Sequence, residues 1–187
     1  MHDDSILVQR ALKGDRKAFE MIIVKYQQPL VSYLGRMTGE RETALDFAQD
    51  IFLKAYSALD SYRSSFKFST WLFKIASNHM IDHWRKKKIA AVSLDQPFDG
   101  DESSPRPQVE DGGPSVARNY ELAELRARIE KALDRIPAAF RELFVLRHVN
   151  EFSYEEIADI KDLPVGTVKN RVFQAKELLR RQLEGNI

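Results

Sequence analysis

The sequence predicts an all-α protein made of two small helical domains that a flexible acidic linker joins. Apolar residues recur at spacings of three and four along most of the 187-residue chain, which is the period of amphipathic helices. A stretch rich in Pro, Gly, Ser and acidic residues interrupts this pattern, and a helix, a tight turn and a second helix follow near the carboxyl-terminal end. We expect one domain over residues 1–92, the linker over 93–118 and a second domain over 119–187.

Composition and charge exclude several classes of protein. The chain has no cysteine, so disulfides, thiolate catalysis and thiolate metal sites are excluded, which fits a reducing cytosol. No stretch approaches the roughly 20 apolar residues of a membrane span, and the acidic start MHDDSILVQR is not a signal peptide. We expect a cytoplasmic protein without direct membrane insertion. The net charge of +1 does not by itself indicate a nucleic-acid ligand, so the distribution of charge decides.

Residues 4–38 predict two helices whose role is packing. Ile6 and Leu12 belong to the apolar face of the short first helix. Asp15 is a good cap for the second helix, which Pro29 should kink or split. No catalytic residue type stands out in this segment.

Residues 41–60 predict a third helix with more apolar surface than one core stripe requires. Phe47, Ile51 and Tyr56 widen that surface, while acidic and amide side chains occupy the other side of the helix. An acidic face beside surplus apolar residues suits a protein partner, and a plainly solvated face is the alternative.

The loop over residues 61–68 interleaves aromatic rings with Arg63 and Lys67, and a long helix capped by Ser69 or Thr70 follows it. This loop and helix together carry seven Lys and Arg side chains and a single acid. Rings among cations suit single-stranded nucleic acid, because bases stack on the rings while the cations follow the backbone. The alternative is that the rings are core residues and the final lysines form a solvated helix end.

The linker is acidic, with six acidic residues and one arginine between positions 93 and 117, and it has too little apolar content to fold alone. An acidic tether between two basic regions suggests masking of those regions or mimicry of DNA. A soluble spacer that avoids DNA is the alternative, and the residues favour neither.

Residues 119–150 predict two helices that complete the second domain. Asn119 caps the first, with Leu122 and Leu125 on its inward face, and Pro137 begins the second. Together these helices should bury the apolar stripe of the last helix.

The stretch from Phe152 to Lys176 predicts a helix-turn-helix. Ser153 and Glu156 have the spacing of a capping box, and Pro164 stands at the start of the second helix. The core stripe of that helix consists of Val168, Val172, Ala175 and Leu179.

The two helices of this motif differ in charge, because the first is acidic and the second is basic. A polyanion would be attracted to the second helix only. Its outward face carries Arg, Asn, Gln and Lys side chains, which hydrogen-bond base edges and phosphates in a major groove. DNA binding is therefore favoured over a solvated helical hairpin. Phe173 either packs on a neighbouring helix or contacts a thymine methyl group or a sugar.

Two helical units, an acidic linker and a carboxyl-terminal helix-turn-helix resemble a bacterial sigma factor of the extracytoplasmic-function (ECF) type, group four of the sigma-70 family. In the first domain the resemblance rests on DFAQDIFLKAYSAL and FSTWLFKIASNHMIDHWRKK, and in the second on FSYEEIADIKDLPVGTVKNRVFQAKELL. It covers nearly the whole chain. Two departures concern DNA sequence preference: the loop reads SYRSSFKF, and Asn170 stands where a small residue is common in the family.

The resemblance implies three binding surfaces. Core RNA polymerase, through the clamp of its largest subunit, would dock on Asp46, Gln49, Asp50, Phe52 and Leu53. The minus-10 element would be melted and captured by Tyr62, Arg63, Phe66, Lys67, Phe68, Trp71, Asn78, Asp82 and Arg85. The minus-35 element would be read as duplex by Thr167, Lys169, Asn170, Arg171, Phe173, Gln174 and Lys176.

The resemblance also implies partners and a function. The partners would be the core polymerase, including its flap, promoter DNA, and an anti-sigma factor, which in such families is often anchored in a membrane. The function would be that of an alternative sigma factor, which directs the polymerase to specific promoters and promotes melting.

Two other classes compete with this function. A one-component helix-turn-helix regulator would need a ligand pocket or a dimer surface in its first domain rather than a basic and aromatic one. A protein that only mimics a sigma factor would lack readout residues such as Lys169 and Arg171, which are present. No enzyme and no cofactor are expected, because His79 and His83 lack a third metal ligand and no nucleophile–base arrangement or Gly-rich phosphate loop occurs.

Overall fold

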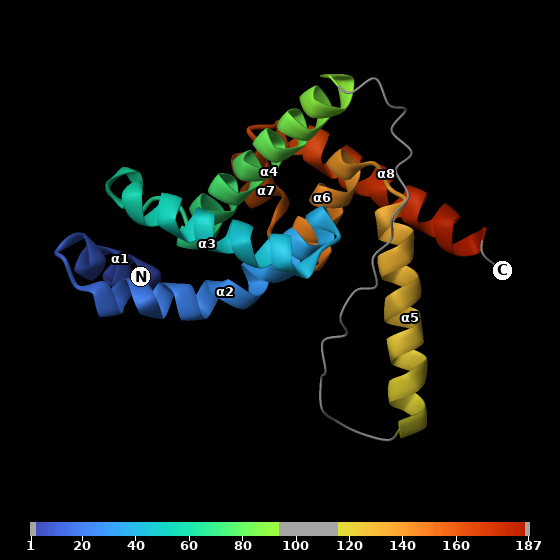
Figure 1. Ribbon diagram of the computed structural model, residues 1–187, viewed down its shortest axis with the longest axis horizontal. Coiled ribbons are helices and arrows are strands. Elements are labelled where there is room, and N and C mark those ends of the chain that lie inside the picture. The colour runs from blue at the N-terminus through green and yellow to red at the C-terminus, as the bar shows by residue number, and fades with distance from the viewer. Residues whose placement is uncertain (1–2, 94–115, 186–187) are drawn as a thin grey trace.

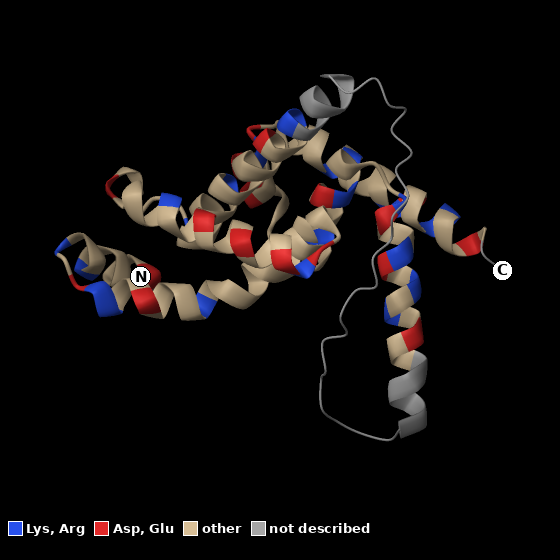
Figure 2. Cartoon of the chain, viewed as in Figure 1, with Lys and Arg blue, Asp and Glu red and all other residues tan. Residues whose placement is uncertain are grey.

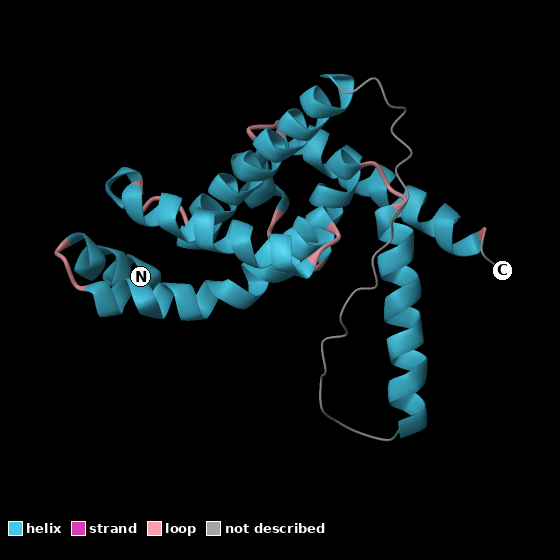
Figure 3. Cartoon of the chain, in the orientation of Figure 1, coloured by secondary structure: helices cyan, strands magenta, loops and turns pink. Residues whose placement is uncertain are grey.

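The structure of the chain is a computed structural model that describes residues 3–93 and 116–185, and the side chains of residues 4–86 and 122–185. Within the described residues it contains eight α-helices, one short 3-10 helix and no strand (Figure 3). The all-α fold class predicted from the sequence is therefore confirmed. Nearly all of the predicted linker, residues 94–115, lies outside the described residues.

The first domain begins with α1 (Asp3–Leu12) and α2 (Arg16–Thr38). Asp15 caps α2 as expected, since its side chain accepts from the backbone N–H of Ala18. The expected split at Pro29 is wrong, because α2 continues through it. A buried face on both sides of the proline, which includes Leu30, holds the helix together despite the missing hydrogen bond. Of the apolar residues expected inward on α1, Ala11 is buried, whereas Ile6 and Leu12 are exposed, and Val8 is buried although it was not expected to be.

The helix expected over residues 41–60 is split near its end, because α3 spans Arg41–Ser57 and the 3-10 helix η1 spans Leu59–Ser61. The following helix, α4 (Phe68–Ser93), begins before Ser69 and Thr70, so neither residue is its cap. Thr70 is buried in the first turn instead.

The second domain comprises α5 (Val116–Asp134), α6 (Ala138–His148), α7 (Tyr154–Lys161) and α8 (Val165–Glu184). The predicted capping box is present: the hydroxyl of Ser153 accepts from the N–H of Glu156 at 3.1 Å, and the carboxylate of Glu156 accepts from the N–H of Ser153 at 2.8 Å. A left-handed residue, Asp162, turns the chain after α7, and Pro164 precedes α8. The predicted apolar stripe of α8 is buried throughout.

The position of α5 differs from the sequence-based expectation. The helix starts at Val116, so Asn119 lies inside it rather than at its cap. Leu122 and Leu125 are about half exposed, because α5 packs on α8 near its own end and otherwise extends away from the body (Figure 1). Periodicity alone could not show that the rest of this helix has few neighbours among the described residues.

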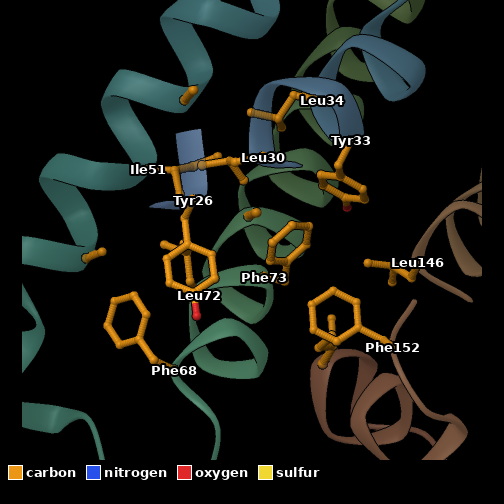
Figure 4. Packing of buried hydrophobic residues seen from close by; sticks show 14 of the residues in the cluster. Tyr26, Leu30, Tyr33, Leu34, Ile51, Phe68, Leu72, Phe73, Leu146 and Phe152 are labelled. Atoms are coloured by element: carbon orange, nitrogen blue, oxygen red, sulfur yellow. The ribbon is translucent and has the colours of Figure 1, made fainter. Parts of the chain in front are cut away.

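The two domains pack against each other and share one hydrophobic core. Helix α4 lies against α7, and α2 lies against α6 (Figure 1). Buried side chains of both domains belong to a single cluster, in which Tyr33 and Phe73 face Leu146 and Phe152 (Figure 4). The rings of Phe73 and Phe152 lie 4.9 Å apart. The helix-turn-helix is thus held directly against the long helix of the first domain.

Candidate nucleic-acid and polymerase interfaces

The outward face of α8 presents the side chains predicted for duplex reading. Thr167 is half-buried at the amino-terminal end of the helix, and the six others are exposed, namely Lys169, Asn170, Arg171, Phe173, Gln174 and Lys176. Opposite them, the buried stripe fixes the helix on α6, so the orientation of this face is set by packing. The geometry is that of a helix free to enter a groove.

Phe173 is not a packing residue within the described structure. Its side chain is 64% exposed, although most aromatic rings of this size are largely buried. Gln174 donates to the amide oxygen of Asn170 at 3.4 Å on the same face. A bare ring beside two amides is suited to contacts with bases and methyl groups.

The two helices of the motif differ in charge, with Glu155, Glu156 and Asp159 on α7 and Lys169, Arg171 and Lys176 on α8, where Figure 2 shows Lys and Arg in blue. Arg180 forms ion pairs with Glu177 and Glu184 on its own helix, so its charge is locally balanced. No ion pair between described residues involves Lys169, Arg171 or Lys176. These three cations are therefore available to phosphates or base edges.

The ring of Tyr154 supports the recognition helix. The guanidinium of Arg147 lies 4.8 Å from the centre of the ring, and the ammonium of Lys169 lies 5.7 Å from it. Both distances are within the range of cation–π attraction. No sequence motif singles out Tyr154, whose only signal is an aromatic residue in the first turn of an acidic helix.

The loop between η1 and α4 is organised by an aromatic cluster. The rings of Tyr62, Phe68 and Trp71 lie 5.4 to 5.6 Å from one another. The hydroxyl of Tyr62 donates to the carbonyl of Phe66 at 2.8 Å, which closes the loop. Burial, and secondarily the charge of Asp4, raise the pKa of Tyr62, so this phenol stays protonated as a donor.

The loop residues divide into a buried anchor and an exposed tip. Phe68 is fully buried, so its expected contact with DNA is corrected to a core role that holds the cluster in place. Arg63, Phe66 and Lys67 are exposed, and Phe66 presents about half of its surface. An exposed ring between two cations is the arrangement that a flipped or single-stranded base requires.

The outward face of α4 carries the remaining residues expected at the minus-10 element. Asn78, Asp82 and Arg85 are exposed, and Arg85 donates to Asp82 at 2.9 Å. Lys74, on the same face, is paired with Asp162 of the second domain at 2.5 Å. The basic surface of α4 is thus partly occupied by the other domain.

The outward face of α3 is acidic and partly apolar. Asp46, Gln49 and Asp50 are exposed, and Leu53 is 67% exposed beside them. Phe52 is buried in the core, so its expected contact with polymerase is corrected to a role in packing. The reason is the helical period, which turns Phe52 inward with Ala48 and Ala55 while Leu53 turns outward.

The histidines of α4 lie against side chains of α3. The rings of His79 and His83 pack on Phe47, and the Nδ1 atom of His79 is 2.8 Å from the ammonium of Lys54. Burial, and then the charge of Lys54, lower the pKa of His79. Within the described part of the chain, no three His, Cys, Asp or Glu side chains are grouped to hold a metal ion.

An apolar hollow of about 460 Å³, which no sequence pattern predicted, lies between α5 and α8. Leu125, Phe144, Leu179 and Leu183 line it, with Arg128 and Arg180 among its polar lining residues. The sequence signal for this hollow is the apolar face of α5, whose leucines were expected inward and are in fact about half exposed.

Comparison with known families identifies both domains. The model of Sigma-70 region 2 matches residues 22–89, and the model of Sigma-70 region 4 matches residues 126–179. The ECF RNA polymerase sigma-E factor of Escherichia coli K12 is 36% identical over 186 residues, which cover 97% of this chain and 94% of the relative. The chain belongs to the sigma-70 family, as a sigma factor of the ECF type. The RNA polymerase sigma-H factor of Pseudomonas aeruginosa is 32% identical over 187 residues, with the same coverage.

Two solved structures resemble this sigma factor over most of its length. The sigma factor RpoE of Bartonella quintana, co-crystallised with the anti-sigma factor NepR, has a TM-score of 0.75 at 26% identity and covers 90% of this chain and 98% of its own. CnrH in complex with the cytosolic domain of CnrY has a TM-score of 0.71 at 25% identity, covering 98% and 99%. Such values over both domains indicate a similar placement of one domain on the other.

The family matches place the candidate surfaces of this sigma factor. Region 2 contains the acidic face of α3, the aromatic loop and the outward face of α4, and region 4 contains the helix-turn-helix. Within the described residues, no helix has the length and apolar character needed to cross a membrane.

Proposed function

We propose that this chain binds the RNA polymerase core, directs it to specific promoters and promotes melting at the start of transcription, as an alternative sigma factor. The observation that carries this proposal is the combination, in one chain, of a basic recognition helix with an exposed aromatic and basic loop. A protein that reads only duplex DNA needs only the recognition helix. A protein that also captures single strands needs the aromatic and basic loop as well.

Duplex reading at the minus-35 element is assigned to the exposed face of α8. Lys169, Arg171 and Lys176 supply charge, and Asn170 and Gln174 supply amides that suit adenine. Phe173 supplies an apolar contact, and Thr167 lies at the helix start, where phosphates bind. The cations gather on this helix and the acids on α7, so the duplex is drawn to α8.

Capture of the melted minus-10 element is assigned to the loop before α4 and to the face that follows it. Phe66 and Trp71 offer ring surface, while Arg63, Lys67 and Arg85 follow the phosphates. Tyr62 holds the loop in shape, and Asn78 and Asp82 provide polar groups on the same side of α4. A base flipped from the duplex would be held by this loop, since stacking on a ring offsets the loss of stacking in DNA.

Docking of the core polymerase is assigned to the acidic face of α3. Asp46, Gln49 and Asp50 surround the exposed Leu53, and charged groups around an apolar centre are typical of protein interfaces. The clamp of the largest subunit would meet this face, and the flap would meet region 4.

Regulation by an anti-sigma factor is supported by the similar structure of RpoE from Bartonella quintana, which is a complex with the anti-sigma factor NepR. The apolar hollow between α5 and α8 is a surface of the kind that a helix of a partner would cover. We place the protein in the cytoplasm, where polymerase and promoter are found, and its connection to a membrane would be through that partner. The chain would act by binding and positioning and not as an enzyme.

We propose the division into residues 1–92, 93–118 and 119–187 as the functional organisation, with region 2, a tether and region 4. The supporting observation is that α4 ends at Ser93 and α5 begins at Val116, so both helix ends lie close to the proposed bounds and extend a little way into the tether. A tether would allow the two DNA-binding surfaces to separate.

Run-off transcription by purified bacterial core polymerase on a library of promoters tests this function. Transcripts from a defined set of promoters, present only when the chain is added, would support it and give the consensus. Duplex binding by the chain alone with no dependent transcript would favour a one-component regulator instead.

A further inference from the structure

A buried polar cluster joins the two domains at the centre of their contact. The phenol of Tyr33 donates to one carboxylate oxygen of Glu142 at 2.8 Å, and the ammonium of Lys161 donates to the other at 2.7 Å. The same ammonium donates to the hydroxyl of Ser77 at 2.7 Å. Tyr33 and Ser77 are fully buried, and Glu142 is 1% exposed.

Each domain supplies half of this cluster. Tyr33 of α2 and Ser77 of α4 belong to region 2, while Glu142 of α6 and Lys161 of α7 belong to region 4. Burial, and then the charge of Glu142, raise the pKa of Tyr33 well above its ordinary value, which keeps the phenol a donor. A charged pair that is buried needs all of its partners, so the cluster is complete only when the domains are together.

Charge around the cluster is complementary, with cations on region 2 and acids on region 4. Three ion pairs cross the contact: Lys67–Glu156 at 2.8 Å, Lys74–Asp162 at 2.5 Å and Arg36–Glu130 at 2.7 Å. Lys67 and Lys74 are also cations of the loop and helix assigned to melted DNA. Glu156 of α7 and Asp162, which follows that helix, therefore pair with two cations that could otherwise contact phosphates.

The closed arrangement is too compact to reach both promoter elements. Helix α8 has 20 residues and is about 30 Å long, and it follows directly after α7, which touches α4. Elements centred near minus 10 and minus 35 are separated by about 25 base pairs, which is roughly 85 Å along a straight duplex. Region 4 must leave region 2 before both surfaces can engage the promoter.

We propose that the Glu142–Lys161 pair, with Tyr33 and Ser77, is an autoinhibitory latch that holds region 4 on region 2 in the free chain. The inhibitory effect of the latch rests on the proposed function. The latch keeps the two DNA-binding surfaces too close together to reach both promoter elements, and it covers two of the cations. Closure itself can be measured without polymerase or DNA.

Breaking one side of the latch should favour the open chain. Lys161→Met leaves the carboxylate of Glu142 buried and unpaired while the domains are closed, whereas opening returns it to water. Loss of one partner of a buried pair should lower the ratio of closed to open molecules at least about 100-fold. Glu142→Gln combined with Lys161→Met removes both charges and should restore most of the closed population, because a neutral amide still accepts from Tyr33.

Energy transfer between two dyes reports closure directly. The chain has no cysteine, so Ser64→Cys and Glu155→Cys give the only two labelling sites. Both residues are exposed, and each neighbours the Lys67–Glu156 pair, so the dyes lie close together only in the closed chain. We expect high transfer in the otherwise native chain, strong loss with Lys161→Met, and recovery with the double variant. Arg10→Met, which also removes one cation from an ion pair but within region 2, should leave transfer unchanged.

Tyr33→Phe provides a second test, because it removes only a hydroxyl group and should not unfold the chain. It should lower transfer less than Lys161→Met does, with an unchanged circular dichroism spectrum. Unchanged transfer in both Lys161→Met and Tyr33→Phe would overturn the latch, and so would low transfer in the native chain. Neither outcome would bear on promoter-dependent transcription, which the run-off assay measures separately.

Discussion

Phe73 of α4 packs its ring against that of Phe152, the residue before the capping box of α7, with the centroids 4.9 Å apart and the planes at 63°. This edge-to-face contact joins region 2 to region 4 and lies in the same core as Tyr33 and Leu146 (Figure 4). The interface between the domains is thus built like an interior, with rings and the buried polar cluster inside it and ion pairs at its rim.

Phe152→Ala should lower the free energy of unfolding by about 3 kcal/mol or more, because it removes a buried ring and leaves a cavity. Urea denaturation followed by circular dichroism measures this. Phe173→Ala is the matched control, since the same ring is removed from an exposed position, and its effect on stability should stay within about 0.5 kcal/mol. Equal losses in the two variants would contradict the assignment of Phe152 to the core.

Arg171→Ala should weaken promoter binding by about 1–3 kcal/mol and relax specificity at one position of the minus-35 element, as expected for a bidentate base contact. Binding to a set of single-base variants of the element, measured with holoenzyme, tests both effects. Arg180→Ala is the control, because that guanidinium is already paired with Glu177 and Glu184. If Arg171→Ala leaves both affinity and base preference intact, Arg171 does not read the DNA.

Asp50→Arg should abolish binding to core polymerase while the chain stays folded, because it reverses a charge at the centre of the acidic face of α3. Co-purification with core polymerase measures the loss, and the circular dichroism spectrum checks the fold. Glu20→Arg, an equal charge reversal at an exposed site on α2, should bind normally. Normal assembly of the Asp50→Arg holoenzyme would remove this face from the docking surface.

Acid should weaken the contact around Glu156. Burial raises the pKa of this carboxyl. Hydrogen bonds from Lys67 and from the backbone of Ser153 lower it by a larger amount, so the net result is a pKa below the ordinary 4.5. A carboxyl group whose pKa is lower in the folded chain than in the unfolded chain stabilises the fold at pH values above its unfolded-state pKa. This stability is lost as the pH falls through the folded-state pKa. The fall in unfolding free energy between pH 6 and about pH 3 should be smaller in Glu156→Gln than in the native chain. Glu155→Gln, one residue away and exposed, should retain the full pH dependence, and an identical slope in Glu156→Gln would contradict the expected linkage.

Local features of the fold were predictable because they depend on neighbouring residues. The capping box of Ser153 and Glu156, the cap at Asp15 and the buried stripe of α8 all follow from spacing within one or two turns. The continuity of α2 through Pro29 did not follow, because packing on both sides of the proline outweighs its local preference.

The burial of Phe52 and Phe68 was not predicted, since a family motif gives the positions of a surface but not the direction of each side chain. Helical period separates Phe52 from Leu53, and the aromatic cluster anchors Phe68 while Phe66 stays outside. The contact between the domains could not be predicted either, because Tyr33 and Glu142 meet only through the tertiary fold. No periodicity in either segment indicates that meeting.

The most direct test of the account is run-off transcription from one selected promoter by core polymerase with either the native chain or a variant carrying Lys169→Ala, Arg171→Ala and Lys176→Ala. We expect a transcript with the native chain and a loss of at least about 100-fold with the triple variant, because three phosphate or base contacts on one helix are removed. A native chain that yields no transcript, or a triple variant that transcribes as well as the native chain, would contradict it.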